Sequence, residues 1–126
     1  MSIHTRGAIL HLVPLPQRPS DVVENAAARL RAAREALGIQ QQDMARACGS
    51  EPQRWNNWEA GRSLPDAVVL IRAHALYGIS LDWVYAGDPR NLPGRLLDAL
   101  RTRRPDLMPG ASEAPTDLGA IDRRQA

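Results

Sequence analysis

The stretch Gln41–Gly61, QQDMARACGSEPQRWNNWEAG, is the part of this chain that most clearly indicates a fold. Residues 41–48 carry apolar side chains at spacings that stack them on one face of a helix. Gly49 favours a helix end, because glycine adopts left-handed backbone conformations at little cost. Pro52 then sets φ for the first turn of another helix. The stretch therefore predicts two short helices joined by a tight glycine turn, the helix-turn-helix arrangement.

The second of these helices is expected to have a buried face and a polar face. Trp55 and Trp58 are three positions apart and point to the same side, which we expect to face the core. Gln53, Asn56 and Asn57 remain on the other side. Amide side chains can form paired hydrogen bonds with adenine in the major groove, so the pattern favours contact with DNA bases over an ordinary solvated surface. Stacking on single-stranded bases is the alternative to core packing for the two tryptophans.

Length and composition are those of a single domain. The chain has 126 residues, enough for one hydrophobic core, and its prolines gather near both ends. We expect a flexible N-terminal arm at 1–19, a helix-turn-helix domain at 20–88, a C-terminal amphipathic helix at 89–104 and a disordered tail at 105–126.

Hydrophobic spacing and glycine positions predict an all-α fold. Ser20 and Asp21 offer an N-cap for a first helix that is expected to run to Leu37. Further helices are expected at 41–48, 52–60, 66–77, 81–86 (with Ser80 as N-cap) and 92–103. The core stripe of the helix that ends at Tyr77 is expected to contain Leu70, Ala73, His74 and Tyr77.

Charge, cysteine content and hydropathy narrow the class of protein. Every basic residue is arginine, and the net charge of +2 is too small by itself to establish a polyanionic partner. Cys48 is the single cysteine and lies on an apolar helix face, which predicts a buried thiol in a reducing cytoplasm. No apolar run approaches about 18 residues, and the N-terminus lacks the pattern of a signal peptide, so we expect no membrane association.

The chain shows no catalytic constellation. It has no lysine for a Schiff base, no glycine-rich phosphate loop and no paired carboxylates beside a histidine. His4 and His11 have no cysteine or carboxylate at ligand spacing. We therefore expect no enzyme activity, no cofactor, no metal and no small-molecule ligand.

Several motifs, taken in order, resemble lambda-repressor-like (XRE-type) helix-turn-helix domains. They are RxxREALGIxQ at 31–41, WExGRSLP at 58–65 and YGISLDWVYAG at 77–87, with Ala45 and Gly49 between them. The similarity runs without a gap from about Leu30 to Gly87. It implies a five-helix DNA-binding domain, here with an additional C-terminal helix and flexible termini.

The resemblance also implies residue roles. Gln41 matches a glutamine that bonds a DNA phosphate, and Arg54 falls at a position that meets the DNA backbone. The base-facing positions are occupied by Pro52, Gln53, Asn56 and Asn57, of which the proline has no polar side chain. Arg34 and Glu59 match a pair that forms a structural salt bridge between the first and third helices.

These features predict a sequence-specific transcriptional regulator of a prokaryote or phage. We expect a repressor that binds double-stranded DNA at a near-palindromic operator as a homodimer, in the cytoplasm and associated with the nucleoid. The alternative is a protein-interaction module, such as an antitoxin or a subunit of a hetero-complex, in which the helix-turn-helix surfaces bind another protein.

Two apolar stripes are left over for a dimer contact. The first stripe lies on the fourth helix and contains Val68, Val69 and Leu76; the second contains Leu92, Leu96, Leu97 and Leu100. Uncovered aliphatic patches usually mark interfaces, so we expect both stripes to form a two-fold contact. The alternative is that the last helix folds back and buries both stripes within one chain.

Overall fold

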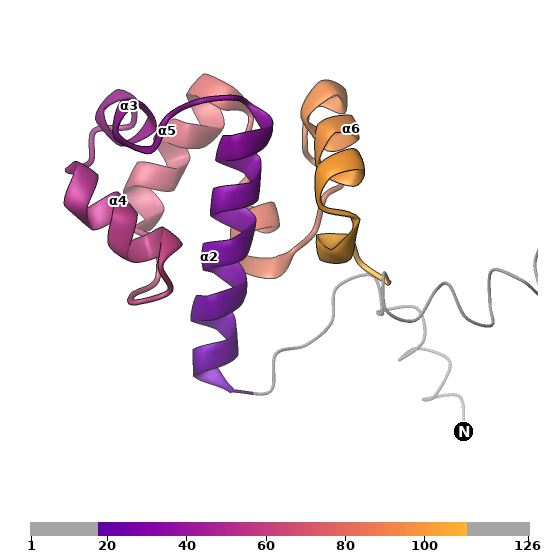
Figure 1. Cartoon of the computed structure of the whole chain (residues 1–126), viewed down its shortest axis with the longest axis horizontal. Helices are drawn as coiled ribbons and strands as arrows, with labels where there is room; N and C mark the ends of the chain where they lie inside the picture. The colour runs from indigo at the N-terminus through magenta and orange to yellow at the C-terminus, as the bar shows by residue number, and fades with distance from the viewer. Residues whose placement is uncertain (1–17, 111–126) are drawn as a thin grey trace, which may run out of the picture.

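The computed structural model of this chain describes residues 18–110, which form helices and, within that range, no strand (Figure 1). The elements are α2 (Pro19–Ala36), α3 (Gln41–Ala47), α4 (Pro52–Glu59), α5 (Ala67–Tyr77), the π-helical turn η2 (Asp82–Ala86), α6 (Gly94–Arg103) and the 3₁₀ turn η3 (Pro105–Leu107). The predicted all-α class is confirmed. Most of the predicted N-terminal arm (1–17) and of the predicted tail (111–126) lies outside the described residues.

The longest helix, α2, lies at the centre of the domain. It packs against α4 and η2 and, on another side, against α6 (Figure 1). Its buried residues are Ala26, Ala27, Leu30, Ala32 and Ala33. Because alanine side chains are short, neighbouring helices can approach α2 closely on more than one side. This helix is therefore the common support of the domain.

α2 begins earlier than the predicted cap at Ser20 and Asp21. Pro19 is its first residue, and the carboxylate of Asp21 accepts a hydrogen bond of 3.1 Å from the backbone N–H of Arg18. Proline suits this position because its φ is already helical and the N–H that it lacks would have had no intrahelical partner. The prediction was wrong by one or two residues, since proline outweighed the serine as a start signal.

Two later N-caps are formed by short polar side chains. The Asp66 carboxylate accepts from the backbone N–H of Val69 at 3.1 Å, and the Ser80 hydroxyl accepts from that of Trp83, also at 3.1 Å. The cap predicted at Ser80 is confirmed. Each bond satisfies an N–H group that has no partner within its own helix.

The core stripe of α5 is rotated from the predicted one. Val69, Leu70 and Ala73 are buried, Tyr77 is half-buried, and His74 is exposed. The prediction of a core position for His74 was therefore wrong. Burying the branched aliphatic side chain of Val69 is favourable, whereas a buried imidazole requires a hydrogen-bond partner.

α6 folds back against α2 and completes the core. Leu92, Leu96 and Leu100 are buried, and Leu97 is half-buried. The prediction of a dimer contact was wrong for these three buried leucines and for Val69, because the chain itself covers them. Full burial of a leucine contributes about 1.5–3 kcal/mol, which a single chain gains here without a partner.

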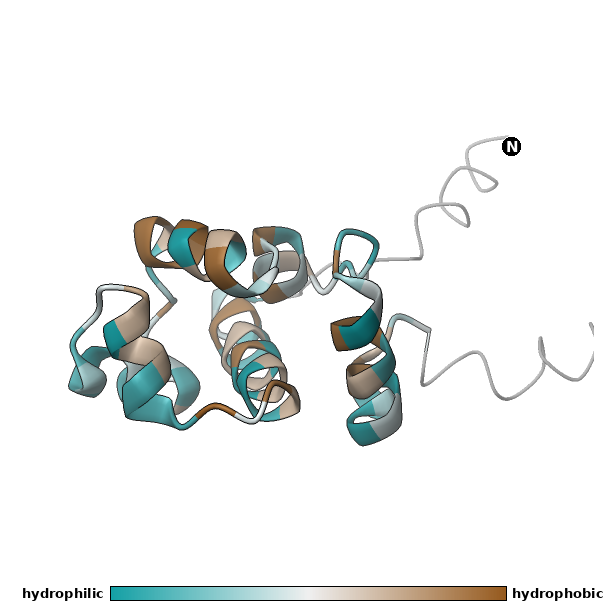
Figure 2. Ribbon diagram, turned by 90° about the horizontal axis from the view of Figure 1, so that it is seen from above, coloured by the Kyte–Doolittle hydropathy of each residue, from teal (hydrophilic) through white to brown (hydrophobic). Residues whose placement is uncertain are grey.

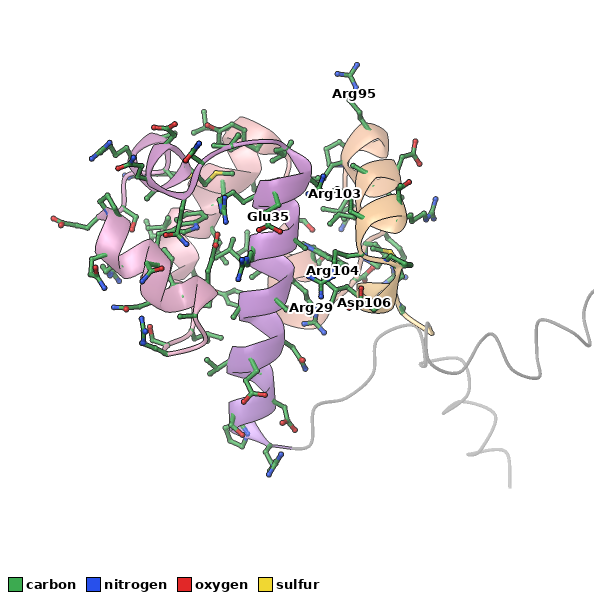
Figure 3. All side chains as sticks on the ribbon, in the orientation of Figure 1. Arg29, Glu35, Arg95, Arg103, Arg104 and Asp106 are labelled. Atoms are coloured by element: carbon green, nitrogen blue, oxygen red, sulfur yellow. The ribbon has the colours of Figure 1, made fainter. Side chains whose placement is uncertain are left out.

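The chain stays folded for a few residues beyond α6. Leu107 and Met108 pack against the core, and Arg104 and Asp106 lie together as an ion pair of 2.9 Å (Figure 3). Residues 105–110 were predicted to belong to a disordered tail, and this was wrong. The apolar pair Leu107–Met108 gains burial by packing against the core.

One buried carboxylate joins the three N-terminal helices. The Glu59 side chain is 3% exposed and accepts four hydrogen bonds. Arg34 of α2 donates two, at 2.7 and 2.9 Å, Gln41 of α3 donates one at 3.0 Å, and the Trp55 indole donates one at 2.7 Å. Arg34 also donates to the carbonyl of Ile39, at 2.8 Å. The hydrogen bond to Glu59 is the main reason that the pKa of Arg34 lies above its ordinary value.

The turn that leads from α5 to η2 depends on Gly78. Its φ of 81° is in the left-handed region, where a side chain is strained. A Cβ at this position would also overlap the ring of Pro93, whose Cδ would lie 2.9 Å away. Gly38 has a similar φ of 73°, but a Cβ added there would meet no atom within 4 Å. A side chain at Gly38 would therefore meet backbone strain alone, whereas one at Gly78 would meet both backbone strain and crowding against Pro93.

Gly78→Ala is expected to destabilise the fold more than Gly38→Ala. The backbone strain costs roughly 1–2 kcal/mol at either position, and overpacking against Pro93 adds about 1–3 kcal/mol at Gly78 alone. Urea unfolding followed by circular dichroism measures both. Equal losses in free energy of unfolding in the two variants would show that the ring of Pro93 can move away from the added Cβ without a cost in free energy.

Arg34→Met is expected to lower the free energy of unfolding by about 3–5 kcal/mol, because it leaves the buried Glu59 carboxylate without its cation. The matched control is Arg31→Met on the same helix, where the ion pair with Glu35 is exposed and should contribute no more than about 1 kcal/mol. Thermal and urea unfolding provide the comparison. Losses of similar size in the two variants would contradict this role for the buried pair.

Candidate nucleic-acid interface

The turn between α3 and α4 sets the direction of α4. Gly49 has a φ of 81°, and Pro52 occupies the first turn of α4. Cys48, at the end of α3, is fully buried, and this burial raises the pKa of its thiol. The side chain of Arg72 lies over Gly49, so a Cβ there would overlap its guanidinium. The contact with Arg72 therefore holds the turn in place, in addition to the backbone conformation of Gly49.

The inner face of α4 is formed by its two tryptophans. Trp55 is 0% exposed and Trp58 is 2% exposed, as the predicted core packing requires. Their rings are tilted by 56° with centroids 5.6 Å apart, a geometry that aromatic pairs favour. The indole N–H of Trp55 is satisfied by Glu59. These contacts leave the opposite face of α4 as the outer one.

The outer face of α4 carries the predicted base-contacting residues. Gln53 is exposed, and Asn56 and Asn57 are partly exposed. α4 lies at the edge of the domain beside α2, and α6 lies on the other side of α2 (Figure 1). The polar outer face of α4 is therefore accessible at the edge of the domain, on a helix that packs against α2.

Two of these amides are linked to a residue that sequence reasoning missed. Asn57 Oδ1 accepts a hydrogen bond from Arg62 Nη1 at 3.0 Å and one from Gln53 Nε2 at 3.4 Å. Arg62 belongs to the loop that follows α4 and directly succeeds the helix-ending Gly61. Its place in the WExGRSLP motif was visible in the sequence, but its partner was not, because the pairing depends on how the loop turns back.

The residues predicted to meet the DNA backbone have internal contacts as well. One N–H of the Gln41 amide donates to Glu59, and the amide nitrogen carries a second N–H. The exposed Arg54 guanidinium lies 5.2 Å from the ring centroid of Trp58, within cation–π range. Both contacts restrict where these donors can lie.

α5 presents aliphatic side chains to solvent. Val68 is 60% exposed, and Ile71 and Leu76 are each 56% exposed. We call these three residues the α5 aliphatic face; positions i, i+3 and i+8 lie on the same broad side of a helix. Figure 2 shows α5 as a largely hydrophobic helix at the edge of the domain. Val68 and Leu76 belong to the predicted interface, whereas Ile71 was not predicted.

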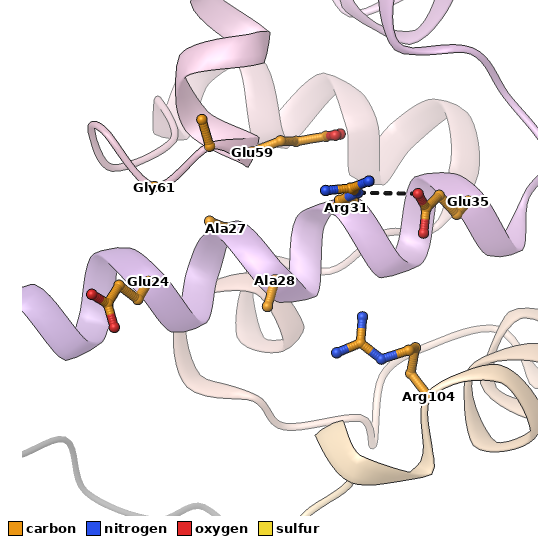
Figure 4. A pocket seen from close by; sticks show the side chains of 9 residues that line it. Glu24, Ala27, Ala28, Arg31, Glu35, Glu59, Gly61 and Arg104 are labelled. Carbon is orange, nitrogen blue, oxygen red and sulfur yellow. Dashed lines mark hydrogen bonds and ion pairs between the residues drawn. The ribbon is translucent and has the colours of Figure 1, made fainter.

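An open hollow of about 410 Å³ lies beside α2 and the end of α4 (Figure 4). It is lined by Glu24, Ala27, Ala28, Arg31, Glu35, Glu59, Ala60, Gly61 and Arg104. Its two arginines are already paired, Arg31 with Glu35 and Arg104 with Asp106. The hollow is therefore lined by paired arginines, by carboxylates and by short side chains.

Residues 18–110 offer neither a metal site nor a membrane span. No group of three or more histidine, cysteine or acidic side chains in that range is placed to hold a metal ion. No helix within the same range is both long and apolar enough to cross a membrane.

The comparison with protein families agrees with this geometry. Residues 27–88 match the family model described as a helix-turn-helix domain, a segment that contains α3, α4, α5 and η2. No curated protein and no solved structure matches the chain. Domains of this kind typically bind DNA and are not enzymes. Residues 27–88 therefore form a helix-turn-helix domain, and the match is consistent with the lambda-repressor-like (XRE) type that the order of the motifs predicts.

Proposed function

We propose that this chain is a sequence-specific DNA-binding regulator that inserts α4 into the major groove. The observation that carries the proposal is the division of α4 into two faces. Trp55 and Trp58 are buried, whereas Gln53, Asn56 and Asn57 lie on the outer side. A helix fits the major groove, and amides supply the donors and acceptors that discriminate base edges there.

The hydrogen bonds of Glu59 support this role because base readout needs a fixed helix. They tie α4 to both α2 and α3 through a buried carboxylate. A recognition helix held by its own scaffold has little conformational freedom left to lose on binding. Gln41 takes part in the same network, and its second N–H is proposed to donate to a phosphate, with Arg54 contributing a further backbone contact.

We propose that two copies bind together through the α5 aliphatic face. Exposed aliphatic side chains on one broad helix side are typical of an interface. A two-fold contact would place the two α4 helices about one DNA turn, roughly 34 Å, apart, and this calls for a near-palindromic operator. We further propose repression in the cytoplasm, on the nucleoid, since a protein that occupies an operator blocks other proteins from the same duplex.

The same aliphatic face favours a second candidate function. A module that binds a different protein, as an antitoxin or a subunit of a hetero-complex, would also need an exposed apolar surface. Duplex binding that weakens steeply with salt supports the DNA-binding proposal. The absence of such binding in the full chain favours the protein-interaction module.

Asn57→Ala is expected to weaken binding to the preferred duplex by about 1–3 kcal/mol and to leave binding to random duplex nearly unchanged. Gln41→Ala should instead weaken binding to both, because a phosphate contact carries no sequence information. Fluorescence anisotropy at fixed salt measures each affinity. If Asn57→Ala lost as much on random duplex as on the preferred one, Asn57 would not read a base.

Val68→Glu and Leu76→Glu are each expected to give a folded monomer that no longer binds an operator cooperatively, because each would bury an unpaired carboxylate in the proposed apolar two-fold contact. Thr102→Glu, at an exposed position on α6, is the control for the added charge. Analytical ultracentrifugation gives the oligomeric state, and anisotropy gives the cooperativity. A dimer of unchanged strength in both variants would exclude this face as the contact.

A further inference from the structure

The hydrogen-bond chain Arg62–Asn57–Gln53 fixes which atoms of two amides can reach DNA. The oxygen of Asn57 accepts from Arg62 at 3.0 Å and from Gln53 at 3.4 Å. A guanidinium has only donors, so the atom of Asn57 that faces Arg62 has to be the oxygen. The atom of Gln53 that faces that oxygen has to be its nitrogen, for the same reason. The usual ambiguity between amide oxygen and nitrogen is thereby removed.

The groups left over are complementary to particular base edges. Asn57 keeps its NH₂ group, which donates, and Gln53 keeps its oxygen, which accepts, and one N–H. A paired contact with adenine requires one amide to offer both a donor and an acceptor. Asn57 cannot do this while two donors occupy its oxygen. Its NH₂ group matches the acceptors of guanine or the O4 of thymine. Adenine also presents an acceptor, N7, but the amino group beside N7 would then find no acceptor on Asn57. The oxygen of Gln53 matches the amino group of adenine or cytosine.

We propose that Arg62 is a positioning residue for base readout, which holds Asn57 so that it reads guanine or thymine and holds Gln53, through Asn57, so that it reads adenine or cytosine. This inference rests on the proposed function. Arg62 acts through Asn57 and is not itself required to touch a base. A plain phosphate contact by Arg62 is the competing role, and it differs in a measurable way, because phosphate contacts do not discriminate between sequences.

The test is a selection of duplexes from a random pool by the full chain and its variants. The base pair read by Asn57 is the one whose preference disappears in Asn57→Ala. The wild-type chain is expected to select guanine or thymine there. Arg62→Ala should shift this position towards adenine by about fivefold or more, because the freed amide can then form the paired contact. Arg62→Lys keeps a donor and a charge and should restore the wild-type preference.

Two further variants sharpen the result. Asn57→Asp keeps an oxygen for Arg62 but replaces the NH₂ group by a second acceptor, so the preference should change to cytosine or adenine. Arg95→Ala removes the same charge at the far end of α6 (Figure 3) and should leave every preference unchanged. Thermal unfolding of each variant is measured alongside, and Arg62→Ala is expected to unfold as the wild type does, since Arg62 is exposed.

Other outcomes overturn the inference. If Arg62→Ala weakens binding to all duplexes equally and the preference at the Asn57 position is unchanged, Arg62 is a phosphate contact only, and the proposed function stands. A wild-type preference for adenine at that position also overturns the inference, because the oxygen of Asn57 would then be reading the base, and the proposed function again stands. If the wild-type chain selects no sequence at all, the proposed function and this inference both fail.

Discussion

The buried carboxylate of Glu59 is the interaction on which the geometry of this domain depends. A charge that is 3% exposed is costly to bury unless its oxygens are satisfied, and here Arg34, Gln41 and Trp55 satisfy them with four hydrogen bonds. These donors come from α2, α3 and α4. Any rotation of α4 relative to α2 and α3 would break at least one of these hydrogen bonds. The carboxylate would then be left with an unsatisfied oxygen in an apolar environment. Such a pair specifies an arrangement of helices more than it adds net stability.

The division of α4 into an inner and an outer face follows from that restraint. Trp55 packs inward and also donates to Glu59, so one residue supplies both apolar burial and orientation. With the helix fixed, the directions of its outer amides are set by their own hydrogen bonds, in which Arg62 holds Asn57 and Asn57 holds Gln53. Rigid support and pre-oriented polar groups are the two requirements for reading a base edge without a large entropic cost.

The spacing of apolar residues in the sequence does not reveal which of them the chain covers and which stay exposed. α6 turns back along α2, so Leu96 and Leu100 are covered within the chain, and Val69 is covered on α5. Val68, two residues after the N-cap Asp66, stays 60% exposed because it points away from that core. α5 is apolar on more than one side, and the described residues of this chain cover only one of them. The remaining side is the surface on which a partner is proposed to bind.

Sequence by itself determined the all-α class, the helix-turn-helix, the inward tryptophans and the helix ends at glycines, because helical periodicity and glycine or proline conformations act locally. The order of its motifs also pointed to a helix-turn-helix domain, which residues 27–88 match, and to the pair of Arg34 with Glu59, which is present. Tertiary structure alone decided which side of α5 is buried, that α6 folds back, and that Arg62 reaches Asn57. The first two depend on the direction in which a turn sends the next element, and contacts between residues far apart in the chain leave no periodic pattern in the sequence. The third joins residues only five positions apart, but it depends on how the loop after α4 turns back.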